Sequence, residues 1–386
     1  MKNNWKNLQD LLFFQEGPGV RKNQFRNNGI KLLNVGNINN KKLNLDTTSI
    51  FITEEEAYGK YSHFLVEDGD LLICCSGIVV DNFHNKIVFA EEKHLPLCLN
   101  TSTMRFRTLN NDILNIKFFY YFLMTRLFKE QLQKLITGSA QLNFGPSHIK
   151  KISMPIIEMN KQKQIAKTLD KANELIELRK ESIIKLDALA KSIFIDMFGD
   201  PLSKDIKNFE LLGNLANIVM GQSPNGDSYN DKGLGEPLLN GPTEFGKKYP
   251  KEKQYTTNPK KFSKHGDILF CVRGATAGKL NYSDKKYCIG RGLASISSKS
   301  KYSNSYLFYL LDYHYDYFQK NSNGSTFINI CKDDLFNLKV PISNEDIQNK
   351  FAKIIEKIEE QKSLYEKELE KLEENFQALL QKSFQE

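Results

Sequence analysis

The chain has 386 residues, a formal net charge of +8, and a hydrophobic fraction of 40%. This length suits two domains with connecting elements, and the apolar content is too high for a disordered chain. No apolar run reaches the roughly 18–20 residues of a membrane-spanning helix, and the polar start of the chain does not predict a signal peptide.

The first block, residues 1–159, is predicted to be a β-rich domain with some helix. Short β-branched or aromatic runs at 70–75 and 86–90 predict strands, and the Gly, Asn and Asp residues between such runs predict turns. An apolar pattern over 116–136 predicts a helix. The block carries a net charge of +4, as expected for a domain that meets a polyanion.

Residues 160–198 are predicted to form one long helix. Its apolar residues recur at alternating spacings of four and three, which gives a narrow seam suited to a partner helix, and Gly199-Asp-Pro201 ends it. The seam consists of Ile165, Leu169, Ile176, Ile183, Leu186 and Ile193.

The second block, residues 199–344, repeats this composition with a net charge of +6, a predicted strand at 267–272 and a predicted helix at 305–319. A second long helix follows over 345–386 and carries a net charge of −4. Its seam consists of Phe351, Ile355, Ile358, Leu369, Leu372 and Phe376.

The order of short motifs indicates that the chain is an internal duplication. Matching pairs occur in the same order in both halves, and the second half has shorter loops between them, as surface loops allow. The pairs are Trp5, Leu8, Leu11 and Gly17 with Phe209, Leu212, Leu215 and Gly221; 29–34 with 235–240; 69–77 with 266–274; and Gly138-Ser139 with Gly324-Ser325.

The fold class is therefore α+β, with two homologous β-rich domains joined by two long helices. We expect the helices to pack as an antiparallel coiled coil, because this covers both apolar seams and relates the two blocks by a pseudo-two-fold axis. A generic dimerisation coiled coil is the alternative interpretation of the heptads.

Two β-rich blocks, each followed by a heptad helix, resemble the specificity (S) subunit of type I restriction-modification systems. The motifs of the second half match best: Gly221-Gln-Ser-Pro224, Gly235–Gly241, Gly266–Gly274 and Gly324–Asn329. The first half departs from them, with Gly17-Pro-Gly-Val20 in place of the first motif and Ser76 in place of Arg273.

This resemblance implies that each block is a target recognition domain that reads one half of a split site in double-stranded DNA. It further implies that the helices set the spacer and dock two methyltransferase (M) subunits, which modify adenine N6 with S-adenosylmethionine. ATP-driven restriction (R) subunits would join the full complex. A specificity subunit of a related defence system is the nearest alternative.

Loop residues that suit DNA contacts occur in both blocks. Arg pairs with guanine and Asn or Gln with adenine, whereas Lys, Ser and Thr hold phosphates, and Gly lets the backbone approach closely. The candidates are Arg21, Lys22, Asn34, Asn37, Gln141 and Asn143 in the first block, and Gln222, Asn240, Arg273, Lys279, Arg291 and Thr326 in the second.

The sequence shows no catalytic constellation, and we expect no cofactor. The segment Gly274–Lys279 has three residues between its glycines and is followed by Leu280, so it does not match a phosphate loop. The histidines lack metal-ligand spacing, and the six cysteines predict buried, reduced thiols in a cytoplasmic protein. A self-sufficient DNA-modifying enzyme and a protein-binding coiled-coil scaffold are the remaining rival functions.

Overall fold

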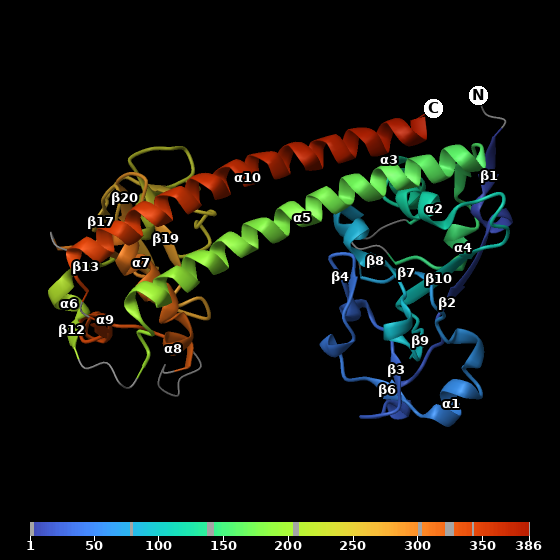
Figure 1. Cartoon of the computed structure of the whole chain (residues 1–386), viewed down its shortest axis with the longest axis horizontal. Coiled ribbons are helices and arrows are strands. Elements are labelled where there is room, and N and C mark those ends of the chain that lie inside the picture. Colours follow the sequence, from blue (N-terminus) through green and yellow to red (C-terminus); the bar gives the residue numbers. More distant parts are fainter. Residues whose placement is uncertain are drawn as a thin grey trace. The chain divides into compact units, whose positions relative to one another are not determined.

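The computed structural model describes residues 4–77, 80–136, 143–203, 208–299, 303–320, 328–341 and 343–385. The chain divides into two compact units, described separately below (Figure 1). Unit 1 comprises Met1–Arg179 and Glu368–Glu386, and unit 2 comprises Lys180–Lys367. The long helices α5 (Met159–Phe198) and α10 (Glu345–Gln385) therefore each contribute one half to either unit.

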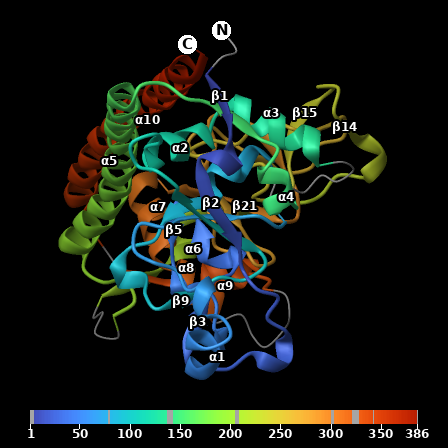
Figure 2. The same ribbon diagram turned by 90° about the vertical axis from the view of Figure 1, so that its right-hand side faces the viewer.

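Unit 1 is built on an antiparallel sheet with the strand order β2-β10-β7-β8, which includes the runs expected at 70–75 and 86–90. A smaller sheet, β6-β3-β9, and helix α1 lie at the end of the unit remote from its part of α5 (Figures 1 and 2). The strands are β1 (Trp5–Asn7), β2 (Leu12–Glu16), β3 (Ile30–Leu32), β4 (Ile38–Asn39), β5 (Lys42–Leu43), β6 (Phe51–Ile52), β7 (Leu71–Cys74), β8 (Ile87–Phe89), β9 (Leu97–Cys98), β10 (Thr103–Thr108) and β11 (Ser153–Pro155). The helices besides α5 and α10 are α1 (Glu54–Tyr58), α2 (Ile116–Phe122), α3 (Arg126–Leu135) and α4 (Pro146–Ile149).

Unit 2 repeats this topology, with the strand order β13-β21-β18-β19 in its antiparallel sheet. Its second sheet has the order β14-β16-β15-β20-β17, and β15 runs parallel to β20 as β3 runs parallel to β9 in unit 1. The strands are β12 (Phe209–Leu211), β13 (Ala216–Met220), β14 (Tyr229–Asn230), β15 (Glu236–Leu239), β16 (Tyr255–Thr256), β17 (Phe262–Ser263), β18 (Ile268–Cys271), β19 (Leu280–Tyr282), β20 (Tyr287–Ile289), β21 (Leu293–Ser298) and β22 (Lys339–Pro341). The helices are α6 (Leu212–Leu215), α7 (Asn304–Tyr313), α8 (Tyr315–Lys320) and α9 (Lys332–Phe336).

The helices expected at 116–136 and 305–319 are each broken in two, so the expectation of single helices was wrong. In unit 1 the hydroxyl of Thr125 accepts a hydrogen bond from the Phe128 amide at 3.2 Å and starts a new helix as an N-cap. In unit 2 the imidazole of buried His314 donates to the Leu310 carbonyl at 2.8 Å, between α7 and α8. Both breaks therefore coincide with a side chain that bonds to the helix backbone.

The long helices belong to the hydrophobic core of each unit. In unit 1, Leu169 and Ile176 of α5 share a core with Phe376, Leu380 and Phe384 of α10. In unit 2, Ala190 and Phe194 of α5 share one with Phe351, Ile355 and Ile358 of α10. The other expected seam residues lie partly buried: Ile165, Leu369 and Leu372 against the core of unit 1, Leu186 and Ile193 against that of unit 2, and Ile183 in neither.

The apolar seam shifts near the ends of the long helices, where α10 packs against α2 in unit 1 and α5 packs against α7 in unit 2. The Phe384 ring stacks on Phe118 of α2 with centroids 4.6 Å apart, and Phe194 stacks on Tyr306 of α7 at 5.7 Å. The buried positions near the C-terminus are therefore spaced by four residues, whereas a continued heptad would bury Leu379, which is 38% exposed. A heptad pattern describes helix pairs, and a third packed helix changes the period.

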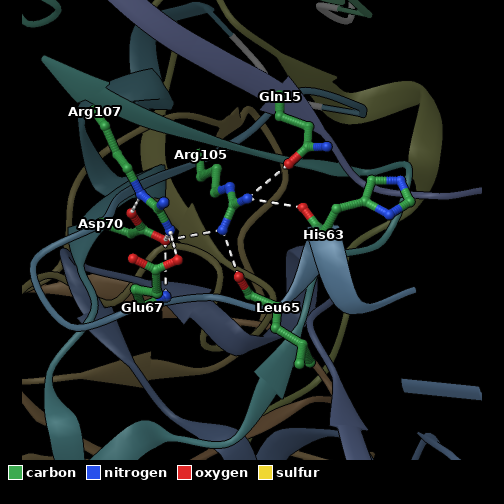
Figure 3. A network of polar contacts seen from close by, with 7 residues as sticks. All are labelled: Gln15, His63, Leu65, Glu67, Asp70, Arg105 and Arg107. Atoms are coloured by element: carbon green, nitrogen blue, oxygen red, sulfur yellow. Dashed lines mark hydrogen bonds and ion pairs between the residues drawn. The ribbon is translucent and has the colours of Figure 1, made fainter. Parts of the chain in front are cut away.

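The Arg105 side chain connects the main sheet of unit 1 to the segment 63–70, which precedes β7 in the sequence (Figure 3). Its Nη2 donates to the Gln15 side chain and to the His63 carbonyl, both at 2.8 Å, and its Nη1 donates to the Leu65 carbonyl. The carboxylate of Asp70 lies 3.4 Å from Nη1, and both charged groups are buried. A buried charge is tolerated only with such partners.

Five of the six cysteines, those at 74, 75, 98, 271 and 288, are buried as expected. The expectation was wrong for Cys331, which is exposed because it lies in a loop directly before α9. Burial raises the pKa of the Cys74 thiol to about 12. Among the helices of the described ranges, none is both long and apolar enough to cross a membrane.

Candidate nucleic-acid interface

In unit 1, several loops converge where the ends of the strands meet. We call Gly17, Asn34, Ser76–Gly77, Asn100–Ser102 and Asn143 the loop cluster of unit 1. Backbone hydrogen bonds hold these loops together. They run from Gly17 N to Thr103 O (3.1 Å), from Leu33 N to Cys98 O (2.8 Å), from Cys75 N to Ser102 O (2.9 Å) and from Phe144 N to Cys75 O (3.0 Å). The cluster therefore stands on buried, regular structure.

Unit 2 contains the same arrangement. Its loop cluster consists of Gly221, Asn240, Arg273–Gly274, Gly290–Gly292 and Asn329. Three bonds match those of unit 1: Gly221 N to Leu293 O at 2.9 Å, Val272 N to Gly292 O at 2.9 Å and Ile330 N to Val272 O at 2.8 Å. A further bond, Gly290 N to Leu239 O at 2.8 Å, also joins the loops of unit 2. The duplication thus extends to individual hydrogen bonds around the loops.

Two equivalent glycines are required by close backbone packing. A Cβ atom at Gly17 would lie 2.4–2.5 Å from the backbone of Asn100. At Gly221 it would lie 2.2 Å from the Gly290 carbonyl oxygen. Since backbone atoms cannot move aside as a side chain can, only glycine fits where these loops cross.

Asparagines fasten the clusters internally. The Asn34 side chain accepts a hydrogen bond from Asn100 Nδ2 at 2.7 Å. Asn143 Oδ1 accepts from the Ser76 hydroxyl at 2.9 Å and from the Gly77 amide at 3.0 Å. In unit 2, Asn240 Nδ2 donates to the Gln254 side chain at 2.8 Å. These asparagines position the loops, and some of their polar atoms already form hydrogen bonds within the protein.

Asn37 differs from the other expected contact residues because it is fully buried. Its Oδ1 accepts from the Asn34 amide at 2.9 Å and from the Thr48 hydroxyl, and its Nδ2 donates to the Asn44 carbonyl and the Thr47 hydroxyl. The side chain therefore supports the loop from inside and presents no polar atom to the surface.

Exposed cationic and amide side chains surround the clusters. Arg273, Arg291 and Gln222 are exposed in the cluster of unit 2 or beside it, and Lys279 is exposed at the far end of the loop that begins at Arg273. Arg21 and Lys22 are exposed just after the Gly17 loop of unit 1. The expected residues Gln141 and Thr326 lie outside the described residues.

Sequence reasoning missed Asn100 and Thr101, which occupy the places of Gly290 and Arg291. The segment Asn100–Ser102 contains no glycine, so it does not look like Gly290–Gly292. The following strands, however, keep one register, because Gly17 bonds to Thr103 as Gly221 bonds to Leu293. Aligning the strand runs 103–108 and 293–298 first would have revealed the match.

A half-buried carboxylate lies at the edge of the unit 1 cluster. Glu16 is the last residue of β2, opposite buried Met104, and its Oε2 would lie 3.0 Å from a Cβ at Gly145. Burial raises the pKa of Glu16. Its equivalent in unit 2 is Met220, opposite Ala294, so the two clusters differ in charge as well as in shape.

The clusters offer hydrogen-bond donors and positive charge on a fixed backbone, which suits recognition of a polyanion and of base edges. In the part of the chain that the structure describes, no group of three or more His, Cys, Asp or Glu side chains is placed to hold a metal ion.

Comparisons with known proteins agree with this interpretation. The family model for the type I restriction modification DNA specificity domain matches twice, over residues 2–188 and 204–374. A Methanocaldococcus jannaschii protein assigned as the type I restriction enzyme MjaX specificity subunit is 30% identical over 95% of this chain and 89% of its own length. The MjaVIII specificity subunit of the same organism is 24% identical over 48% of this chain and 43% of its own length.

Solved structures show the same fold. The S subunit of a type I restriction-modification system from M. genitalium superposes with a TM-score of 0.56 at 19% identity, over 100% of this chain and 98% of that one. A chain from a study of complex assembly and conformational transition of the type I R-M system gives a TM-score of 0.57 at 22% identity, over 83% of this chain and 82% of that one.

Proposed function

Since the chain belongs to the family of type I restriction-modification DNA specificity subunits, we propose that its two loop clusters each contact one half of a bipartite DNA site. The protein recognises DNA sequence for its restriction-modification system. The observation that supports the role of the clusters is their repetition: the same backbone arrangement occurs in both units, but with different exposed side chains. A shared backbone that carries different exposed side chains suits the recognition of two unlike half-sites.

The proposed contact residues fall into two groups. Arg273, Arg291 and Gln222 in unit 2, and Arg21 in unit 1, have exposed side chains that can reach base edges. Lys22 and Lys279 are exposed point charges suited to phosphates. Asn34, Asn143 and Asn240 position the loops, whereas Asn37 is excluded from contact by its burial.

We further propose that α5 and α10 pack as an antiparallel coiled coil that sets the spacer between the half-sites. Support comes from each unit by itself. In unit 1 the first half of α5 packs with the last part of α10, and in unit 2 the second half of α5 packs with the first part of α10. Arg179 of α5 pairs with Glu368 of α10 at 2.7 Å in unit 1, and Lys362 of α10 pairs with Asp187 of α5 at 2.5 Å in unit 2, so one ion pair joins the two helices in each unit.

In this proposal the chain is a non-catalytic, cytoplasmic subunit. Two methyltransferase subunits dock on the hydrophilic faces of the helices, including the Glu and Lys residues between Glu356 and Glu374. These partners supply adenine-N6 methylation with S-adenosylmethionine, and restriction subunits supply ATP-dependent cleavage. The specificity subunit needs no cofactor of its own.

The proposal is tested by duplex binding of the full-length chain, copurified with its methyltransferase, at several salt concentrations. Binding to phosphates releases counterions, so affinity falls steeply with salt. Lys279→Gln should weaken binding to all sequences alike and reduce the salt slope by about one. The control, Lys117→Gln, removes a charge that is paired with Asp170 at 2.6 Å and should change neither.

The rival functions predict different results. A protein-binding scaffold would form a salt-insensitive complex without DNA. A self-sufficient enzyme would cleave DNA or consume S-adenosylmethionine as the purified chain alone. A specificity subunit of a related defence system would bind one split site but leave adenine methylation unchanged.

A further inference from the structure

Arginine is scarce in this chain, and its placement is uneven. Only eight of the 54 basic side chains are arginine. Unit 2 contains two arginines, Arg273 and Arg291, and both lie in its loop cluster; every other basic side chain of the unit is lysine. Lysine therefore supplies the general positive charge, whereas arginine occurs where its planar, five-donor fork can act.

Most other arginines are engaged inside unit 1. Arg105 and Arg107 contact Asp70, Arg126 pairs with Glu130, and Arg179 pairs with Glu368. Arg26 donates to the carbonyls of Asn23 and Phe25, both at 3.0 Å. By contrast, the guanidinium groups of Arg273 and Arg291 are exposed and have no hydrogen bond or ion pair to any described residue.

The backbone beneath these two arginines is nevertheless fixed. Arg273 forms a β-bridge with Asn329, and Arg291 N donates to the Ser223 hydroxyl at 3.2 Å. The Val272 amide bonds to the Gly292 carbonyl at 2.9 Å, so the two arginines project from adjoining loops. Because the backbone of both arginines is already fixed, less conformational entropy is lost when their guanidinium groups bind a ligand.

We propose that Arg273 and Arg291 each read a guanine in the half-site of unit 2. This inference rests on the proposed function. An arginine can donate two parallel hydrogen bonds from its rigid planar fork to guanine O6 and N7 in the major groove, whereas the rotatable ammonium of lysine is not held in that geometry. The equivalent positions in unit 1 are Ser76 and Thr101, whose short hydroxyls lack this reach. These two positions of unit 1 therefore cannot make the bidentate contact to guanine.

The test compares Arg273→Lys and Arg291→Lys with the unchanged chain in selection from a random duplex library, using the full-length chain copurified with its methyltransferase. Each variant should lose preference for guanine at one position, by roughly ten- to hundredfold. The same half-site should respond to both variants, and the other half-site should stay unchanged. Because the charge is kept, the salt slope should also stay unchanged.

Arg126→Lys is the matched control, because Arg126 lies on α3 and pairs with Glu130 at 2.5 Å. It should alter no base preference. Retained guanine preference in both loop variants, or a responding half-site without guanine, would overturn the inference in favour of phosphate contacts. An unchanged chain that selects no sequence at all would instead contradict the proposed function, so the two failures are distinguishable.

Discussion

The Asp70 carboxylate accepts a hydrogen bond from Arg107 Nη2 at 2.9 Å in unit 1, where both oxygens of this buried group face guanidinium donors. The equivalent Asp267 of unit 2 instead accepts from the Ser295 hydroxyl at 2.5 Å. Each aspartate also accepts from the amide three residues before it, Glu67 or Lys264. The Gly-Asp motif is thus a turn shared by both units, with an ion pair added in unit 1.

Asp70→Asn should lower the free energy of unfolding of unit 1 by about 3–5 kcal/mol, because it leaves Arg105 buried without its counter-charge. The single tryptophan, Trp5, belongs to unit 1, so urea denaturation followed by its fluorescence measures the effect. Glu67→Gln is the control, because the Glu67 carboxylate is exposed and should contribute less than about 1 kcal/mol. Equal midpoints for the two variants would refute the role of the buried pair.

Gly221→Ala should distort the loop cluster of unit 2, because the new methyl group would overlap the Gly290 carbonyl oxygen. Overpacking of this kind costs about 1–3 kcal/mol. The free energy of DNA binding should weaken by a comparable amount. Gly226→Ala is the matched control in the same segment, since nothing lies within 4 Å of a Cβ there. Fluorescence anisotropy with a labelled target duplex measures both, and equal affinities would contradict the assignment of the cluster.

Phe384→Ala should destabilise unit 1 by about 3–5 kcal/mol, because Phe384 is buried against Phe118 at the end of α10. Leu379→Ala should cost less than about 1 kcal/mol, because Leu379 is 38% exposed. A simple continued heptad predicts the reverse order. Urea midpoints from Trp5 fluorescence decide between the two patterns.

His314 should make the stability of unit 2 depend on pH. Burial lowers the pKa of His314 below its ordinary value of 6.5, so the unfolded chain binds this proton more readily than the folded one. The native state is therefore favoured above pH 6.5, and this advantage is lost as the pH falls below that value. His314→Gln should show a smaller fall in the urea midpoint between pH 7.5 and pH 5.5, measured by circular dichroism. An identical fall would assign the dependence to other groups.

Much of the fold could be predicted from short-range sequence signals. Duplicated motifs predicted the two homologous blocks, and the β-branched runs at 70–75 and 267–272 predicted β7 and β18. The break at Thr125 could not be predicted from apolar periodicity, because an N-cap hydroxyl begins a new helix without changing the hydrophobic pattern. The burial of Phe384 depends on α2, which is far away in the sequence.

The candidate site could be predicted only in part. The glycines beside Arg273 and Arg291 predicted these arginines as DNA contacts, and the structure brings their two loops together. Asn37 misled the prediction, since an asparagine that holds a loop from inside and one that contacts DNA look alike in a sequence. Side-chain burial depends on tertiary packing, which residue type does not reveal.

The most direct test of the account is a genome-wide map of N6-methyladenine in cells that contain this chain with its methyltransferase, compared with cells that lack only this chain. Cells that lack only this chain should lose methylation of one split motif with two unlike half-sites and a fixed spacer. An identical map in both cells would contradict the claim that the two units select a bipartite site for adenine methylation.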